Sequence, residues 1–312
     1  NYFSHLGVYR ASLVRKVGGL RQEFEGAQDH DLVLRCSEQV APGQIRHVPR
    51  VLYHWRVHSA STADAAEAKP YARKAGVKAL EEHYKRIGVR ARVEGAAAGY
   101  HTRYAIPDPA PLVSLIIPTR NARALVQQCI ESIEQKTRYP NYEIILVDNG
   151  SDDPSAVSYF RSLADRPGSR VRVLRDDREF NYSALNNMAA SNAKGELIGL
   201  INNDIEVISP EWLSEMVGIA IQPGVGAVGA CLWYPNDTLQ HGGVVLGIGD
   251  LAGHAHKFMP RGGKGYFMRA VLTQSFSAVT AACLIVNKQA FDQVEGLDAE
   301  NLKIAYNDVD FS

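Results

Sequence analysis

The chain has 312 residues, 46% of them hydrophobic and 22% charged, which is long and apolar enough for one large globular domain or two ordinary ones. Its 34 basic and 34 acidic residues cancel, so it lacks the excess positive charge of proteins that bind nucleic acid non-specifically, and DNA and RNA are not expected partners. Its four cysteines are far apart and form no CxxC pair, so neither a zinc site nor a disulfide framework is expected, and a cytoplasmic location is the simpler interpretation.

Residues 1–60 do not begin like a domain, and an internal repeat suggests the reason. Each copy of the repeat has a Val-x-Gly-Leu motif followed by a pair of acids: Val17-Gly18-Gly19-Leu20 with Asp29 and Asp31, and Val294-Glu295-Gly296-Leu297 with Asp308 and Asp310. The acids of the two copies are 279 residues apart (308 − 29), a period of domain size. We therefore expect residues 1–60 to be the C-terminal fragment of one domain, and residues 111–312 to be the N-terminal and central part of a second domain of the same kind.

Residues 61–110 are expected to form a helix followed by a proline-containing linker. Between Pro70 and Ile87, apolar residues recur at spacings of three and four with charged residues on the other faces, which predicts an amphipathic helix. The stretch from Gly88 to Pro111 ends in several prolines, which stiffen a chain and stop a helix.

From Pro111 onward, short apolar strands alternate with amphipathic helices, which predicts an α/β fold: a mostly parallel sheet with helices on both faces. Strands are expected at residues 113–117, 142–147, 171–174, 197–201, 225–232 and 278–286. Helices are expected at residues 122–136 and 154–163, from residue 181 or 183 to residue 194, from residue 210 and at residues 288–294. The glycine- and histidine-rich stretch 237–265 is expected to be a long functional or mobile loop.

Two of the predicted strands lead directly into carboxylates. Residues 142–147 are followed by Asp148-Asn149-Gly150-Ser151, and residues 197–201 by Asn202-Asn203-Asp204. In a covered parallel sheet, ligands bind in the crevice at the carboxyl ends of the strands. Carboxylates there can coordinate a divalent cation or accept hydrogen bonds from a nucleotide. Either segment alone could be an ordinary turn, so the two neighbouring acidic strand ends together favour a site.

Four segments in this order resemble the family 2 glycosyltransferases with the GT-A fold: residues 113–121, the turn 147–151, Asn202-Asn203-Asp204 and Asn307-Asp308-Val309-Asp310. The resemblance is greatest to bacterial rhamnosyltransferase-like and O-antigen-assembly enzymes, which are often built of tandem domains. It implies transfer of a hexose or deoxyhexose from a nucleoside-diphosphate donor to a saccharide or lipid-linked saccharide acceptor. A part of the parent protein outside this chain could anchor it, or hold it peripherally, at the inner face of the membrane.

The resemblance also implies which residues bind the donor. The residues expected to border the nucleotide are Pro118, Thr119, Asn121, Asp148, Asn202 and Asn203, with Asp148 accepting a hydrogen bond from the base. Asp204 would be the ligand of a Mg²⁺ or Mn²⁺ ion that bridges the diphosphate and acts as a Lewis acid. Because Asn202 stands in place of the family's first acid, we expect modest metal affinity, with the ion arriving together with the sugar nucleotide.

By the same resemblance, Asp308 is the candidate general base that takes the proton of the acceptor hydroxyl. Asn307 stands where the family has a first acid. Acids at these positions also stabilise a helix N-terminus, a role for which Asp310 is the better candidate. One base without a second carboxylate acting as a nucleophile is typical of direct displacement with inversion, by analogy with glycoside hydrolysis.

Histidines in the glycine-rich stretch are candidates for the acceptor side. His254 and His256 would share one face of an extended segment, as in a metal pair, while His241 precedes them; loop positions and contacts to acceptor hydroxyls are the commoner roles of such residues. Residues 53–59 resemble the segment that closes the donor site in these enzymes, and would belong to the first domain.

Two other functions are alternatives to the enzyme. A non-catalytic sugar-nucleotide-binding or scaffolding domain of a larger polysaccharide-assembly protein is favoured by Asn202 and Asn307, and opposed by Asp204 and Asp308. A nicotinamide-dependent dehydrogenase is disfavoured, because the first strand is followed by no GxGxxG motif.

Overall fold

The computed structural model describes residues 6–52, 54, 70–96 and 99–312. The chain divides into two compact units, residues 1–105 and residues 106–312. Of residues 53–59, expected to resemble a donor-site segment, all but His54 lie outside the described residues. In the described part of the chain, no helix is both long enough and apolar enough to cross a membrane.

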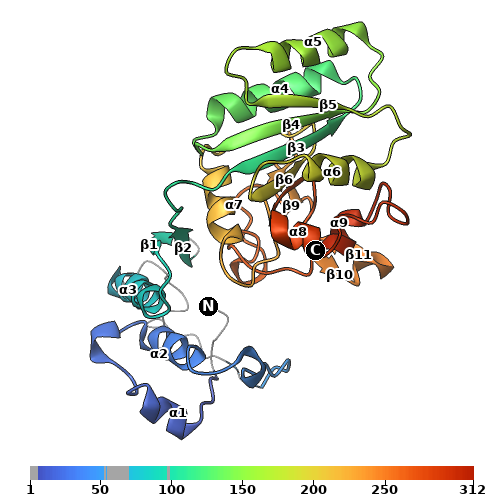
Figure 1. Ribbon diagram of the computed structural model, residues 1–312. Helices are drawn as coiled ribbons and strands as arrows, with labels where there is room; N and C mark the ends of the chain where they lie inside the picture. Colours follow the sequence, from blue (N-terminus) through green and yellow to red (C-terminus); the bar gives the residue numbers. More distant parts are fainter. Residues whose placement is uncertain (1–5, 53, 55–69, 97–98) are drawn as a thin grey trace. The chain divides into compact units, whose positions relative to one another are not determined.

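The first unit consists of helices and one hairpin (Figure 1). Its elements are α1 (Ala11–Lys16), α2 (Gln28–Ser37), α3 (Pro70–Arg86), β1 (Ala91–Ala96), β2 (Gly99–Tyr104) and short 3₁₀ turns at Gln22–Phe24 and Pro42–Gln44. Helix α3 confirms the helix predicted for this region. The stretch expected to be a linker instead contains the antiparallel β1–β2 hairpin. Only Val93 of β1 is fully buried, so this strand needs no alternation of apolar and polar residues, and the sequence pattern did not predict it.

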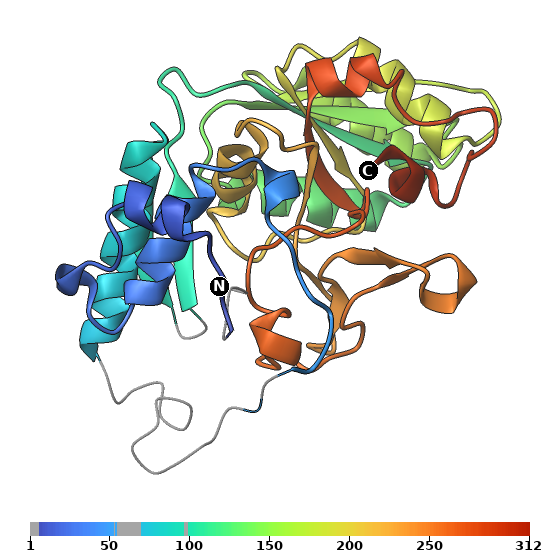
Figure 2. The ribbon, with the colours of Figure 1, turned by 90° about the horizontal axis from the view of Figure 1, so that it is seen from below.

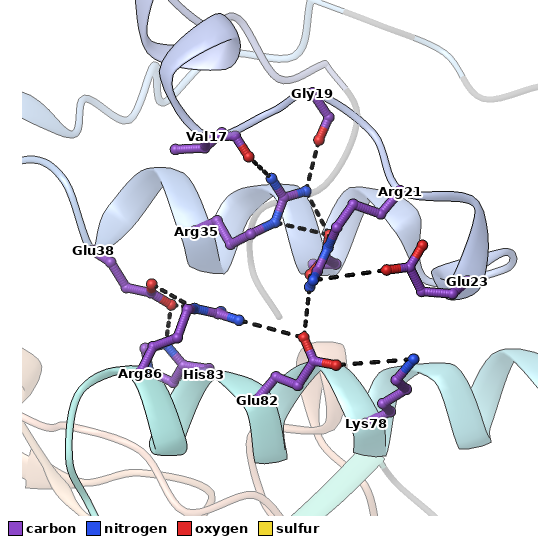
Figure 3. Close-up of polar contacts among 11 residues, drawn as sticks. Val17, Gly19, Arg21, Glu23, Arg35, Glu38, Lys78, Glu82, His83 and Arg86 are labelled. Carbon is purple, nitrogen blue, oxygen red and sulfur yellow. Dashed lines mark hydrogen bonds and ion pairs between the residues drawn. The ribbon is translucent and has the colours of Figure 1, made fainter.

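A buried carboxylate holds α2 in the first unit. The Asp31 side chain is 0% exposed and accepts hydrogen bonds from Arg21 and Arg35. Arg21 also binds Glu82 of α3 at 2.9 Å, and Arg35 donates to the carbonyl oxygen of Gly19 at 2.7 Å. Figure 3 shows this cluster, in which a further ion-paired group joins α2 to α3 through Glu38, His83 and Arg86.

We expect Asp31→Asn to destabilise the first unit by about 3–5 kcal/mol, because it leaves two arginines without their buried partner. Burial alone would raise the pKa of Asp31, but the hydrogen bonds from Arg21 and Arg35 outweigh it and hold that pKa below its ordinary value. A carboxyl with a lowered pKa stabilises the fold above its unfolded pKa of about 3.9, and this contribution disappears as the pH falls through the folded pKa. Hydrogen exchange of peptides from α2 and α3, measured in urea at pH 7 and pH 3, would check both effects.

Asp29→Asn is the matched control for this experiment, because Asp29 lies two positions earlier in the same helix and is exposed. It should leave the protection of α2 unchanged. Equal protection in the Asp31→Asn variant and the wild type at pH 7 would contradict the assigned role of Asp31.

The second unit is built on a six-stranded sheet in the order β5-β4-β3-β6-β12-β7. The strands are β3 (Val113–Thr119), β4 (Tyr142–Asp148), β5 (Val171–Arg175), β6 (Leu197–Ile201), β7 (Ala227–Gly229) and β12 (Cys283–Asn287). Strands β3 to β6 are parallel, while β12 is antiparallel to its neighbours β6 and β7. This arrangement confirms the predicted mostly parallel sheet, although β7 and β12 are shorter than expected.

Helices cover both faces of this sheet, as Figures 1 and 2 show. One face packs against α4 (Arg123–Lys136), α5 (Pro154–Asp165) and α7 (Trp212–Ala220), and the other against α6 (Tyr182–Ser191), α8 (Lys288–Gln293) and α9 (Asn307–Phe311). Every residue of β3 is buried because the strand is covered on both sides, which explains its continuous apolar run.

Helix α6 begins as predicted but ends earlier than predicted. The Asn181 side chain caps it by accepting a hydrogen bond from the amide of Ala184. The helix ends at Ser191 rather than Lys194, because the Asn192 amide group donates to the carbonyl oxygen of Met188, and the backbone N–H of Lys194 donates to Glu143.

The stretch 237–265, expected to be a loop, contains most of two small hairpins. They are formed by β8 (Leu232–Trp233) with β9 (Leu239–His241), and by β10 (Val244–Leu246) with β11 (Ala252–His254). Short 3₁₀ turns lie at Ile248–Asp250 and Tyr266–Met268. The strands have only two or three residues each, which is too short for a recognisable alternation in the sequence.

Gly195 allows the chain to pass close to β3 before it enters β6. A Cβ atom at this position would lie 2.7 Å from both the carbonyl oxygen of Leu112 and the amide nitrogen of Ser114. We expect Gly195→Ala to lower the free energy of unfolding by about 1–3 kcal/mol, since backbone atoms would have to move. Gly226→Ala is the control, because a Cβ there would meet no atom within 4 Å. Urea denaturation of both variants would check this, and equal midpoints would contradict it.

Candidate functional site

The strand order reverses direction between β3 and β6. The chain runs from β3 through β4 to β5 on one side, and then returns to the opposite side of β3 with β6. Ligands bind at such switch points, outside the carboxyl ends of the strands. The pairing of β3 with β6 ends at Ile116 and Leu200, whereas the pairing of β3 with β4 continues to Thr119 and Asp148.

Pro118 and Thr119 form the carboxyl end of β3. Pro118 is buried in the strand just beyond the last residue that pairs with β6, where a residue without a backbone N–H does not interrupt that ladder. From the turn after β6, the Asn203 side chain donates from Nδ2 to Oγ1 of Thr119 at 2.9 Å. The predicted nucleotide-binding residues of the first and fourth parallel strands therefore meet at one edge.

Asp148 ends β4 beside Thr119 and is only 4% exposed. Its Oδ1 accepts a hydrogen bond from the amide of Ser151 at 2.9 Å, and its Oδ2 accepts one from Nη1 of Arg175 at 2.8 Å. Arg175 ends β5 directly opposite Asp148 and also donates to the carbonyl oxygen of Ser151 at 3.1 Å. Asp148 therefore shapes the turn after β4 and fixes Arg175, a contact that our sequence analysis missed. That Asp148 binds a base stays a prediction.

Asn121 joins the loop after β3 to the loop after β4. It has a positive φ of 53°, which asparagine tolerates better than most residues. Its Nδ2 donates to Asp152 at 2.8 Å, and its Oδ1 accepts from the amides of Asp152 and Asp153 at 3.1 and 2.9 Å. The β3–α4 and β4–α5 loops are thus tied together by this one side chain.

Asp204 is the exposed carboxylate of the edge. The turn that carries it is fixed on two sides, since the amide of Asn202 donates to the carbonyl oxygen of Ala282 at 3.0 Å and Asn203 binds Thr119. The Asp204 side chain has no hydrogen-bond or ion-pair partner among the described residues. No group of three or more His, Cys, Asp or Glu residues that could hold a metal ion occurs in that part of the chain. A single free carboxylate fits a Mg²⁺-like ion that takes its other ligands from phosphates and water.

Asp308 lies in the first turn of α9, next to the same edge. Its Oδ2 accepts a hydrogen bond from the amide of Ala281 at 3.1 Å, and the neighbouring Ala282 binds Asn202 after β6. Asp308 is half-buried, whereas Asp310 is exposed. The structure therefore places Asp308 beside the carboxyl end of β6 and the start of β12.

Asn307 has a structural role that explains why it is an amide. It is 3% exposed, and its Nδ2 donates to Oγ of Ser183 at 3.2 Å and to the carbonyl oxygen of Leu302 at 3.4 Å. A carboxylate at this position would have no hydrogen to donate to that carbonyl. The amide thereby joins α9 to the N-terminus of α6.

Both copies of the repeated acid pair lie in the first turn of a helix. Helix α2 begins at Gln28 and α9 at Asn307, which is the same offset of 279 residues that separates the acids (307 − 28). Asp29 of the first unit thus occupies the helical position that Asp308 occupies in the second.

The histidines of the glycine-rich stretch pair differently from the His-x-His expectation. His241 of β9 contacts His254 of β11, with 2.9 Å between their Nδ1 atoms, and the backbone N–H of Thr280 points to Nε2 of His241 at 3.4 Å. His256 takes no part in this pair; its backbone has a positive φ of 55°. Among the described residues, no group of three or more His, Cys, Asp or Glu residues that could hold a metal ion includes these histidines.

The chain is similar in sequence to known proteins over most of its length. Residues 114–294 match the sequence profile of Glycosyl transferase family 2. The uncharacterized protein y4gI of Sinorhizobium fredii is 50% identical over 314 residues, which cover 99% of this chain and 34% of that protein. The O-antigen biosynthesis protein RfbC of Myxococcus xanthus is 40% identical over 312 residues, which cover 99% of this chain and 24% of that protein. The chain thus spans about a third of the first relative and about a quarter of the second.

A solved structure supports the fold alone. The crystal structure of GalNAc-T7 with UDP, GalNAc and Mn²⁺ has a TM-score of 0.50 and 14% sequence identity, and the match covers 68% of this chain and 41% of that one. This likeness confirms the GT-A fold that the sequence motifs predicted.

Proposed function

The chain belongs to glycosyl transferase family 2, and we propose that it transfers a sugar from a nucleoside-diphosphate donor to a saccharide acceptor. We assign this reaction to the synthesis of a bacterial surface polysaccharide of the O-antigen type, in the cytoplasm at the inner face of the membrane. The likeness to RfbC supports this assignment. One observation supports the proposal: Asn203, which precedes the free carboxylate of Asp204, contacts Thr119 at the switch point of the sheet, and Asp308 contacts the segment that leads into β12 beside β6.

The donor would lie across the ends of β3, β4 and β6. In this arrangement Thr119 and Asn203 border the diphosphate, while Asp148 and the loop braced by Asn121 border the base. A divalent cation, held by Asp204, would supply positive charge to the departing diphosphate. The fixed turn after β6 would keep this carboxylate in place before the donor arrives.

Asp308 would act as the general base. Its carboxylate would take the proton from the acceptor hydroxyl while the hydroxyl oxygen bonds to the anomeric carbon and the bond from that carbon to the diphosphate breaks. Attack from the face opposite the leaving group would invert the anomeric configuration. The amide of Ala281 and the first turn of α9 hold the carboxylate in a defined orientation.

The tandem arrangement is part of the proposal. We infer that residues 1–60 are the C-terminal fragment of a preceding domain of the same kind. The 279-residue repeat and the equal offset between the starts of α2 and α9 support this inference.

A scaffolding protein without catalysis is the second candidate, but its support is weaker than the sequence suggested. Two residues favoured it because each is an amide where the family has an acid. The amide of Asn307 is explained by the hydrogen bonds that join α9 to α6, so only Asn202 still favours the scaffold.

The experiment that tests the proposal uses the full-length protein with UDP-, GDP- and dTDP-sugars, in the presence of Mn²⁺ or EDTA. We expect acceptor-dependent release of one nucleoside diphosphate, and a product whose anomeric configuration, read by NMR, is opposite to that of the donor. Binding of a nucleotide sugar without release of the nucleotide under any condition would overturn the enzyme and favour the scaffold.

A further inference from the structure

Two histidines near Asp308 form a hydrogen-bonded pair that the proposed reaction does not use. His241 is 1% exposed, while His254, at the end of β11, is half-buried. The Nδ1 atoms are 2.9 Å apart and the two rings are perpendicular, at 90°. This geometry is that of one ring donating to the other.

The group at the buried end of the pair determines where the protons lie. The backbone N–H of Thr280 can only donate, and it points to Nε2 of His241 at 3.4 Å, so this nitrogen carries no proton. Neutral His241 therefore has its proton on Nδ1 and donates it to Nδ1 of His254. Neutral His254 then carries its own proton on Nε2.

The surroundings keep both rings neutral. Burial, followed by the neighbouring His254, lowers the pKa of His241 to about 4. Burial and then Lys257 lower the pKa of His254, and the negative charge of Asp308 only partly opposes them. A second proton on His254 would also place two N–H groups between the Nδ1 atoms, and a second proton on His241 would face the N–H of Thr280. The Nε2–H of His254 is therefore a constant donor near neutral pH.

The pair and Asp308 are anchored to consecutive residues of one segment. The amide of Thr280 binds His241, and the next amide, that of Ala281, binds Asp308 at 3.1 Å. Since Nδ1 of His254 faces the buried His241, Nε2 of His254 points away from that ring. Nε2 of His254 has no hydrogen-bond partner in the part of the chain that the structure describes.

We propose that His254 positions the acceptor sugar by donating its Nε2–H to an oxygen that neighbours the hydroxyl deprotonated by Asp308. This inference rests on the proposed glycosyl transfer. The acceptor would therefore be a saccharide with two neighbouring oxygens, one that attacks the donor and one that binds His254. His254 is thus a positioning residue, and His241 sets its tautomer.

The test compares His254→Ala with the wild type in the full-length protein, with methyl glycosides of rhamnose, glucose, galactose and mannose as acceptor probes. We expect the KM for the acceptor to rise about tenfold, the effect of one lost hydrogen bond. The KM for the donor and the slow transfer of sugar to water should not change. His254→Gln, which also carries a side-chain N–H, should recover part of the loss. His256→Ala, two residues further on, is the matched control and should behave as the wild type.

The possible results separate this inference from the proposed function. Release of no nucleotide by the wild type with any donor would overturn the function itself. A wild type that transfers sugar, together with a His254→Ala variant whose acceptor KM is unchanged, would overturn the inference alone. So would an equal fall in transfer to water and transfer to the acceptor, because that is the result of a merely structural role.

Discussion

Asp308→Asn is expected to lower kcat by about 10²–10⁴-fold, the usual contribution of a positioned general base. The substitution removes the proton acceptor but keeps an oxygen for the amide of Ala281, which Oδ2 of Asp308 binds at 3.1 Å. The first turn of α9 should therefore keep its shape. The Kd of the donor should not change, because Asp308 is assigned to the acceptor side. Steady-state turnover and calorimetry with the same nucleotide sugar measure the two quantities.

Asp310→Asn is the matched control for Asp308→Asn. Asp310 lies in the same first turn of α9 and is exposed. It therefore stabilises the helix N-terminus, and we assign it no part in the reaction. We expect Asp310→Asn to retain nearly all activity. If both variants lose the same fraction of turnover, the loss comes from the helix terminus, and Asp308 is not the base. If neither loses activity, the base lies elsewhere.

The strands that carry the site could be predicted because they are covered on both faces. Such strands are continuous apolar runs, and β6 was predicted with its observed bounds, Leu197–Ile201. The carboxyl ends of parallel strands lie at the same edge of a sheet. The order of the motifs therefore also predicted that Thr119 and Asn203 lie close together, although not the hydrogen bond between them.

Other contacts could not be predicted, because they depend on which segments pair. The ion pair between Asp148 and Arg175 requires the register of β4 with β5. The contact of His241 with His254 requires two hairpins whose strands are too short to detect. From the sequence alone, Asn307 is only an amide at a position where the family has an acid. Its hydrogen bonds depend on the packing of α9 against α6.

The second large effect is expected for Asp204. Asp204→Asn should abolish the gain in nucleotide affinity that Mn²⁺ provides, because the exposed carboxylate is the charged ligand that the turn after β6 offers to the ion. Turnover should fall by at least about 10²-fold, since a Lewis-acid ion contributes several kcal/mol to stabilisation of the transition state. Calorimetry with UDP, GDP and dTDP, each with Mn²⁺ and with EDTA, measures the metal-dependent part of binding directly.

Two further variants make this prediction specific to the metal. Glu206→Gln removes a carboxylate two residues away that is exposed and paired with Lys136 at 2.8 Å, and it should leave the effect of Mn²⁺ intact. Asn202→Asp restores the acid that the family has at this position, and it should tighten Mn²⁺ binding, because a second carboxylate favours a hard cation. A gain of this kind cannot result from misfolding. If Mn²⁺ affects nucleotide binding equally in the wild type, Asp204→Asn and Asn202→Asp, the cation is not held by this turn.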